Sequence, residues 1–349
     1  MTSKTNPGNY FEDFKLHQKL VHATPRTLTE GDASLYHAIF GSRFVLQSAD
    51  SFARGLGFKE SPLDDLLVFH TVFGKSVPEI SLNAVANLGY AEGRFTKHIY
   101  PNVTLRAQSE VIGLKENSNK QTGVVYVRTT GIDDHDEQVL SYVRWVMVRK
   151  RDPEAPVGEA HVPELADHVP ASSLRLPMTI RFDTLFDTGQ SGSKFFFKDY
   201  EIGEKIDHVD GVTVEESDHM LATRLYQNTA KVHFNQFSES KGRFGKRLIY
   251  GGHVISLARA LSYNGLANAV LIAGINGGRH VNPLFAGDTV FAWSEVIDKA
   301  EIRKDCGALR LRLVATKNLP CEGFPDKDAS GKYPDNVILD FDYWAIVPR

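Results

Sequence analysis

The chain has 349 residues but only two cysteines, Cys306 and Cys321. Two cysteines are too few for a disulfide framework or a zinc cluster, so both are expected to be reduced and unpaired. No apolar run is long enough to span a bilayer, and Met1–Gly8 lacks the apolar stretch of a signal peptide. We therefore expect a cytoplasmic protein with no membrane partner.

The chain also lacks an excess of charge of either sign. It has 40 basic and 43 acidic residues and a formal net charge of -3. This balance gives no strong field that would attract nucleic acid or an anionic membrane surface. His, Asp and Glu residues do not recur at the spacing of metal ligands, so the sequence predicts no metal site.

What the chain does contain is a repeat of its own sequence. Matching residues keep the same order in both halves, with a one-residue change in their offset: Phe11 with Phe197, His22 with His208, Thr27 with Thr213, Asn83 with Asn268, and Ser109 with Ser294. Near the ends Trp145 matches Trp344, after an insertion around 321–334 in the second copy. Ordered matches over this length predict two copies of one fold.

Each copy shows the same series of expected elements. The first helices are expected at Glu30–Phe40 and Glu215–Tyr226, and more apolar helices at Leu66–Val77 and Gly252–Tyr263. Extended runs are expected at 24–28, 104–112, 123–129, 139–148, 209–214, 290–297, 308–315 and 337–347. A buried helix wrapped by an antiparallel sheet is the hot-dog arrangement, so we predict an α+β, tandem (double) hot-dog fold.

The repeat also sets the expected domain organisation. Residues 1–150 form the N-terminal hot-dog repeat, which lacks catalytic residues, 151–193 a linker, and 194–349 the C-terminal catalytic repeat. The linker contains five prolines and a Gly-Gln-Ser-Gly-Ser tract, and we expect it to run over the surface. Because open sheet edges are a liability, the two sheets are expected to join edge to edge.

Differences between the copies indicate where chemistry would take place. The second copy combines His233 with a buried helix that begins at Gly251 and Gly252. The first copy has Gln47 in the place of His233, and we place His70 opposite Gly251. Glycines at a helix start let a ligand approach free backbone N–H groups, where the helix dipole favours negative charge.

The segment from Asn228 to His233, followed by a glycine-opened helix, resembles the motif of the MaoC-like, (R)-specific enoyl-CoA hydratases. That motif reads Asp-x-Asn-Pro-x-His, followed by Val-His-Gly. In that family the Asp and His hold the catalytic water, and the glycine N–H polarises the thioester carbonyl. The resemblance implies these roles for Asn228, His233 and Gly251. The sequence departs from the motif because Asn228, Ala230 and Lys231 replace Asp, Asn and Pro.

Three longer segments, Asp64–Lys75, Tyr226–Phe237 and Leu248–Ser256, are similar to the mesaconyl-CoA hydratase (β-methylmalyl-CoA dehydratase) family. The likeness covers nearly the whole chain. It implies a lyase that interconverts β-methylmalyl-CoA with mesaconyl-C1-CoA plus water, in the ethylmalonyl-CoA pathway or a related carbon-fixation cycle. An acyl-CoA is then the substrate, CoA is part of it, and no separate cofactor is implied.

Candidate substrate-binding residues follow from a dicarboxylic thioester. A guanidinium binds a carboxylate bidentately, so Arg43 and Arg224 are candidates for the second carboxylate. The basic stretch 241–247 precedes the glycine-opened helix and is a candidate for the CoA phosphates. Any of these side chains could equally be a solvated or ion-paired surface residue. The predicted substrate-binding residues are Gly252, Arg43, Arg224, Lys241, Arg243, Lys246 and Arg247.

Several functions remain open on the sequence. One alternative is another (R)-specific enoyl-CoA hydratase, and a second is a hot-dog thioesterase, which would need an acidic group where Asn228 stands. A third is a non-catalytic acyl-CoA-binding module, which would not need His233. Because an amide cannot transfer protons, either His233 performs both proton transfers or another acid contributes. The sequence leaves the direction of the reaction open and allows a homo-oligomer such as a dimer.

Overall fold

The computed structural model describes residues 4–182 and 186–349. Its strands form one large sheet in the order β1-β3-β4-β5-β2-β8-β11-β10-β9-β6, and β7 pairs with β9. The first copy supplies β1 (Lys19–Leu28), β2 (Ala84–Phe95), β3 (Val103–Glu116), β4 (Thr122–Ile132) and β5 (Gln138–Arg149). The second copy supplies β6 (Lys205–Asp207), β7 (Val212–Thr213), β8 (Leu271–His280), β9 (Thr289–Arg303), β10 (Cys306–Lys317) and β11 (Val337–Pro348).

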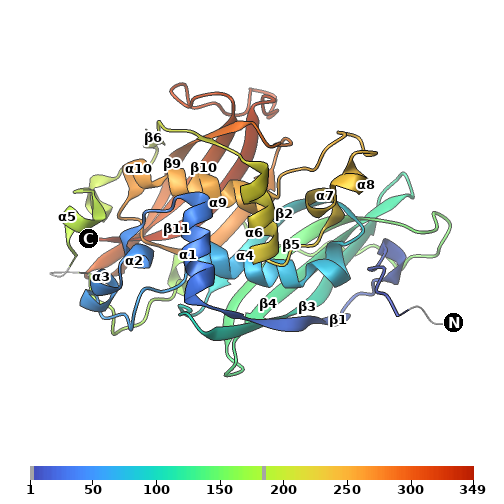
Figure 1. The fold of residues 1–349 in the computed structure, drawn as a ribbon, viewed down its shortest axis with the longest axis horizontal. Helices are drawn as coiled ribbons and strands as arrows, with labels where there is room; N and C mark the ends of the chain where they lie inside the picture. Colours follow the sequence, from blue (N-terminus) through green and yellow to red (C-terminus); the bar gives the residue numbers. More distant parts are fainter. Residues whose placement is uncertain (1–3, 183–185) are drawn as a thin grey trace.

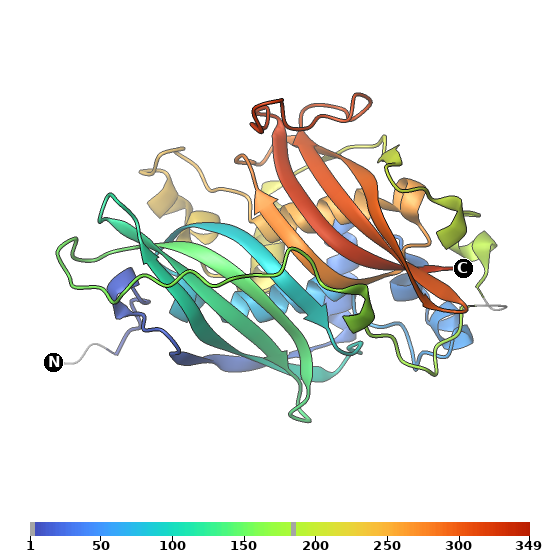
Figure 2. The same cartoon turned by 180° about the vertical axis from the view of Figure 1, so that it is seen from behind.

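The two half-sheets meet where β2 pairs antiparallel with β8 (Figure 2). In this pairing Tyr90 lies opposite Gly278, and Arg94 lies opposite Gly274. Pairing satisfies the backbone N–H and C=O groups that each half-sheet would otherwise expose. The expected edge-to-edge junction is therefore confirmed.

The helices lie on the concave side of the sheet (Figure 1). They are α1 (Glu30–Phe40), α2 (Val45–Ser48), α3 (Asp50–Gly55), α4 (Asp65–Lys75), α5 (Thr188–Ser191), α6 (Glu216–Leu225), α7 (Lys231–Phe234), α8 (Gln236–Glu239), α9 (Gly251–Leu261) and α10 (Tyr263–Leu266). The central helices α4 and α9 are the most deeply buried, because apolar residues cover nearly their whole circumference. The tandem hot-dog architecture is confirmed.

The duplication is visible in individual contacts. His22 Nε2 lies 2.8 Å from the Ser109 hydroxyl, and in the second copy His208 Nε2 lies 2.8 Å from the Ser294 hydroxyl. These residue pairs are the ones that the sequence repeat matches. Both histidines are buried, and each links the strand before the first helix to the sheet. The copies therefore share polar contacts of the core as well as chain topology.

The linker crosses the outer face of the sheet (Figure 2) and is partly built into the core. Val169 and Phe182 are each 1% exposed. The N–H of Val169 donates to Asn276 Oδ1 (2.8 Å), and its carbonyl accepts from the indole N–H of Trp344 (2.9 Å). The expectation of a linker confined to the surface is wrong for these residues. Linker residues 183–185 lie outside the described residues.

Two further expectations can be compared with the structure. Cys306 and Cys321 are both buried and free of disulfides, as expected. Within residues 4–182 and 186–349, no helix has the length and apolar character needed to cross a bilayer.

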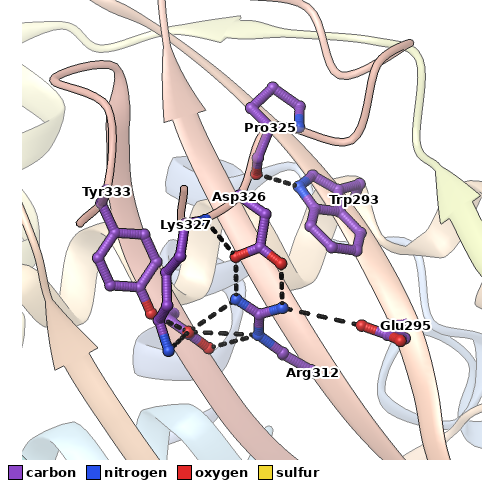
Figure 3. A network of polar contacts seen from close by, with 8 residues as sticks. Trp293, Glu295, Arg312, Pro325, Asp326, Lys327 and Tyr333 are labelled. Atoms are coloured by element: carbon purple, nitrogen blue, oxygen red, sulfur yellow. Dashed lines mark hydrogen bonds and ion pairs between the residues drawn. The ribbon is translucent and has the colours of Figure 1, made fainter. Parts of the chain in front are cut away.

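The insertion of the second copy is held to the sheet by Arg312 of β10 (Figure 3). The guanidinium forms two hydrogen bonds with Asp326 of the insertion (2.5 and 2.7 Å) and also donates to Asp340 of β11 (3.0 Å). The hydrogen bonds from Arg312 lower the pKa of Asp326 below its usual 3.8. The network therefore stabilises the folded chain most when Asp326 is ionised.

We expect Arg312→Met to lower the free energy of unfolding by about 2 kcal/mol at pH 7, less than for a fully buried ion pair because water reaches the site. The lowered pKa means that this stabilisation is present above about pH 4 and lost as pH falls through the folded-state pKa. Urea unfolding of both proteins at pH 7 and below pH 3 measures the difference, which should shrink in acid. Lys327→Met is the control, because Lys327 Nζ lies 3.9 Å from Asp340 and is more exposed. An equal loss in both variants would contradict the assignment.

Candidate active site

The start of α9 is closely packed on two sides. A Cβ atom at Gly251 would collide with the imidazole of His280, and one at Gly252 would collide with the rings of Tyr250 and His70. The first N–H groups of the helix have no preceding turn to supply carbonyl acceptors. His219 Nε2 accepts the N–H of Tyr250 at 2.9 Å. Glycine at 251 and 252 is thus required by packing, and it also leaves helix N–H groups available to a ligand.

His233 lies in the short helix α7, beside this helix start. Its Nδ1 lies 2.9 Å from the carbonyl oxygen of Leu248, which precedes α9. Because a carbonyl can only accept, Nδ1 carries the proton and Nε2 keeps its lone pair. Burial lowers the pKa of His233 to about 4, against a smaller opposite effect of the Leu248 carbonyl. At neutral pH the ring is therefore an uncharged base in a fixed tautomer.

Asn228 is 1% exposed and precedes α7. Its Oδ1 accepts the N–H of Ala230 (3.2 Å), and its own N–H donates to the carbonyl of Thr223 (2.9 Å). The side chain thus holds the turn between α6 and α7 through its oxygen. An oxygen that accepts the N–H two residues on forms an Asx-turn, and it leaves the amide nitrogen as the group that could face water.

The loop that carries Asn228 rests on α4 of the first copy. A Cβ at Gly74 would overlap the carbonyl oxygen of Tyr226. Lys75 Nζ donates to Gln227 Oε1 at 2.8 Å, and Gln227 has a left-handed backbone with φ 55. The first copy therefore fixes the position of the loop in the second.

Our placement of His70 opposite Gly251 was wrong. Helix α4 begins at Asp65 and α9 at Gly251, and both have the same length, so Asp65 is the counterpart of Gly251. Asp65 Oδ2 accepts the N–H of Ile272 (2.8 Å), and Gln47 Nε2 donates to the carbonyl of Val270 (2.9 Å). Burial raises the pKa of Asp65 to about 8. In the first copy, side chains that bind the start of β8 fill the corresponding position.

Four further histidines surround the helix start, and burial lowers the pKa of each. The resulting pKa values are about 3 for His70, about 2 for His219, about 3 for His253 and about 4 for His280. All are therefore uncharged at neutral pH. In the described part of the chain, no three His, Cys, Asp or Glu side chains are placed to share a metal ion.

The two arginines predicted for the second carboxylate lie in different surroundings. Arg43 lines a cleft of about 230 Å³ between α1 and α9, with its guanidinium 4.6 Å from the centre of the Tyr263 ring. Arg224 is exposed on α6. Among the described residues, neither forms a hydrogen bond, ion pair or ring contact with His233, so their assignment to the second carboxylate stays a prediction.

The basic residues of the loop between α8 and α9 differ in their contacts. Lys241, Arg243 and Lys246 are exposed, and each lies over a phenylalanine ring, at 4.2, 5.0 and 4.3 Å from its centre. Arg247 instead pairs with Glu216 at 2.6 Å. The first three therefore remain candidates for binding phosphate, whereas the charge of Arg247 is already compensated.

One polar residue near the site escaped the sequence analysis. Arg144 of β5 is fully buried, and its guanidinium lies over the Phe73 ring, which packs against the ring of Tyr250, the residue before Gly251. The signal was present, because Arg144 is the one charged residue in the otherwise apolar run Val139–Val148. A charge in the middle of a buried strand points to a specific partner.

The fold is that of a MaoC-like double hot-dog protein. The structure superposes with a TM-score of 0.98 on a MaoC domain protein dehydratase from Chloroflexus aurantiacus, at 59% identity, covering 100% of this chain and 99% of the other. A double-hotdog protein from Mycobacterium tuberculosis gives a TM-score of 0.79 at 25% identity, covering 98% and 99%.

Sequence comparison narrows this class. The profile of the mesaconyl-CoA hydratase family matches residues 2–319. A β-methylmalyl-CoA dehydratase from Chloroflexus aurantiacus is 60% identical over 100% of this chain and 99% of its own length. A mesaconyl-CoA hydratase from Cereibacter sphaeroides is 60% identical over 99% and 100%. The chain belongs to the mesaconyl-CoA hydratase family.

We expect Gly74→Ala to lower the free energy of unfolding by about 1–3 kcal/mol, because the new methyl group forces the Tyr226 carbonyl away. Amide hydrogen exchange should then accelerate in the loop 226–234 of the other copy. Gly55→Ala in α3 is the matched control, since a Cβ there meets nothing within 4 Å. Unchanged exchange in the loop of Gly74→Ala would show that α4 does not hold it.

Proposed function

We propose that this protein catalyses the reversible hydration of a branched dicarboxylic enoyl-CoA, with β-methylmalyl-CoA on one side and mesaconyl-C1-CoA plus water on the other. The proposal is supported by two relatives of these activities at 60% identity over full length. The structural observation that carries it is the fixed tautomer of His233, whose Nε2 is a base beside the start of α9.

The chemistry follows from these groups. Nε2 of His233 takes a proton from water as the water oxygen bonds to Cβ, and the electron pair of the double bond moves to the thioester oxygen. The N–H of Gly251 donates to this oxygen, and one such donor typically lowers the barrier by about 3 kcal/mol. The proton on Nε2 is then delivered to Cα. His233 can perform both transfers, and Asn228 needs only to orient the water.

The substrate supplies its own CoA, and the proposed reaction requires no further cofactor. Lys241, Arg243 and Lys246 are the residues that we propose for the CoA phosphates, because they are exposed and form no ion pair within the described chain. The neighbouring phenylalanine rings offer apolar surface for the adenine. The two free cysteines are consistent with a reducing compartment, and we propose the cytoplasm.

A thioesterase is the less favoured alternative. It would need a carboxylate that attacks the thioester or activates water, and the position of the family's Asp is an amide in this chain, Asn228. A non-catalytic acyl-CoA-binding module would not need an imidazole held as a base. Incubation with mesaconyl-CoA separates these functions: loss of enoyl-thioester absorbance indicates hydration, and release of thiol indicates thioester hydrolysis.

We expect His233→Ala to lose at least about a hundredfold in kcat for mesaconyl-CoA, the usual contribution of a general base. Gln47→Ala is the matched control, because Gln47 holds the corresponding place in the first copy and only binds the Val270 carbonyl. It should lose stability but little turnover per folded molecule. Equal losses of kcat in the two variants would mean that the chemistry is assigned to the wrong copy.

We expect Asn228→Asp to fold normally, because a carboxylate oxygen can also accept the N–H of Ala230. Two like charges in a poorly hydrated site repel by a few kcal/mol, so the ratio of kcat/KM for mesaconyl-CoA to that for crotonyl-CoA should fall about tenfold or more. The measurement is made at a pH where the new carboxylate is ionised. A ratio that stays constant or rises would leave Asn228 as a capping residue alone.

A further inference from the structure

Arg144 carries a positive charge in the interior of the first copy. Its side chain projects from β5 onto α4, where the guanidinium lies 4.1 Å from the centre of the Phe73 ring, and the residue has 0% exposure. An ionised group costs several kcal/mol to bury unless a counter-charge and hydrogen bonds compensate it. A buried arginine is therefore expected to have hydrogen-bond acceptors and a counter-charge around its guanidinium.

The partners within the described chain are incomplete. Nη2 donates to the Ser76 hydroxyl (2.8 Å), and Nη2 and Nη1 donate more weakly to the Ser81 hydroxyl (3.4 and 3.5 Å). No carboxylate of the described residues lies within 4 Å of the guanidinium, and Nε has no acceptor. The hydroxyl of Tyr142, two residues away on the same strand, also has no partner. Because buried donors without acceptors are rare, this excess of donors suits an anion.

The position of Arg144 connects it to the catalytic end of α9. Arg144 lies opposite Tyr90 in the pairing of β5 with β2, and Tyr90 lies opposite Gly278 of β8. The Tyr90 hydroxyl is 3.2 Å from Nε2 of His280, the ring that packs against Gly251. Arg144 is therefore joined to the proposed oxyanion site by one row of contacts across the β2–β8 junction.

We propose that Arg144 binds the free carboxylate of the acyl group and so selects dicarboxylic over monocarboxylic enoyl thioesters. This inference rests on the proposed function. A short branched diacid places its carboxylate only a few bonds from the thioester carbonyl. The guanidinium is well suited to it because a planar fork binds both carboxylate oxygens, and the surrounding histidines are uncharged and do not compete.

The second copy offers a comparison for Arg144. Trp145 corresponds to Trp344, so the counterpart of Arg144 in the second copy is Tyr343, which is equally buried. The second copy has its own buried arginine beside Tyr343, Arg259, which binds Ser262 as Arg144 binds Ser76. Arg259 also donates to the Ala269 carbonyl, whereas Nε of Arg144 has no acceptor in the described chain.

The test compares two substrates in the full-length protein. In Arg144→Met, kcat/KM for mesaconyl-CoA should fall at least about a hundredfold, as for the loss of one partner of a buried charge pair. The value for crotonyl-CoA, which has no second carboxylate, should change only a few-fold. Arg259→Met is the matched control, because this buried guanidinium already binds the Ala269 carbonyl and the Ser262 hydroxyl. It should leave the ratio of the two substrates unchanged.

The outcomes are distinguishable. A wild-type protein that hydrates neither substrate overturns the proposed function itself. A wild-type protein active on mesaconyl-CoA, with equal losses for both substrates in Arg144→Met, overturns the role of Arg144. If Arg144→Met does not fold, Tyr142→Phe decides, since it removes only an unpartnered hydroxyl and should fold. In Tyr142→Phe, the ratio of kcat/KM for mesaconyl-CoA to kcat/KM for crotonyl-CoA should fall several-fold. If this ratio is unchanged, the proposal is overturned.

Discussion

The pairing of β2 with β8 is the interaction on which the rest of this structure depends. It closes the exposed edge of each half-sheet, and it brings Tyr90 of the first copy next to Gly278 of the second. Without this register, the Tyr90 hydroxyl would not reach His280, and the inner face of β5 would not be continuous with the start of α9. The two repeats therefore share one continuous core across the β2–β8 junction.

Within that interior the copies contribute different parts. The second copy supplies His233 and the glycine-opened helix, while the first supplies the surface of α4 on which the loop with Asn228 rests. The equivalent place in the first copy is filled by Asp65 and Gln47, which bind the backbone of Ile272 in β8 and of Val270 just before it.

Much of the fold could be predicted from the sequence, because hydrophobic periodicity and the internal repeat are local or pairwise properties of the chain. Helix α1 was expected at its observed bounds, and α4, α6 and α9 were expected within two residues of theirs. The alignment of the two buried helices was wrong at His70. Similar residues were matched there without knowledge of the residue at which α4 begins. Asp65 at the helix start was the better guide.

The site was harder to predict than the fold. His233 and Gly251 are identified by a short sequence pattern, whereas the surroundings of Arg144 depend on the lateral order of three strands that are far apart in sequence. Arg43 and Arg224 were predicted from the chemistry of a guanidinium alone, and the sequence could not show that Arg43 lies over Tyr263 or that Arg224 is exposed. Burial, which distinguishes Arg144 from these two, is a property of the folded chain.

The covalent fusion of the two repeats has a further consequence. In a symmetric homodimer of single hot-dog chains, each substitution occurs twice, so a buried arginine gained at one site would also appear at the other. A tandem gene removes that constraint. Position 144 can hold an arginine while its counterpart holds Tyr343, and each half can change without imposing the same change on its twin. Covalent fusion thus allows equivalent positions of the two copies to differ, as Asp65 and Gly251 do at the starts of α4 and α9.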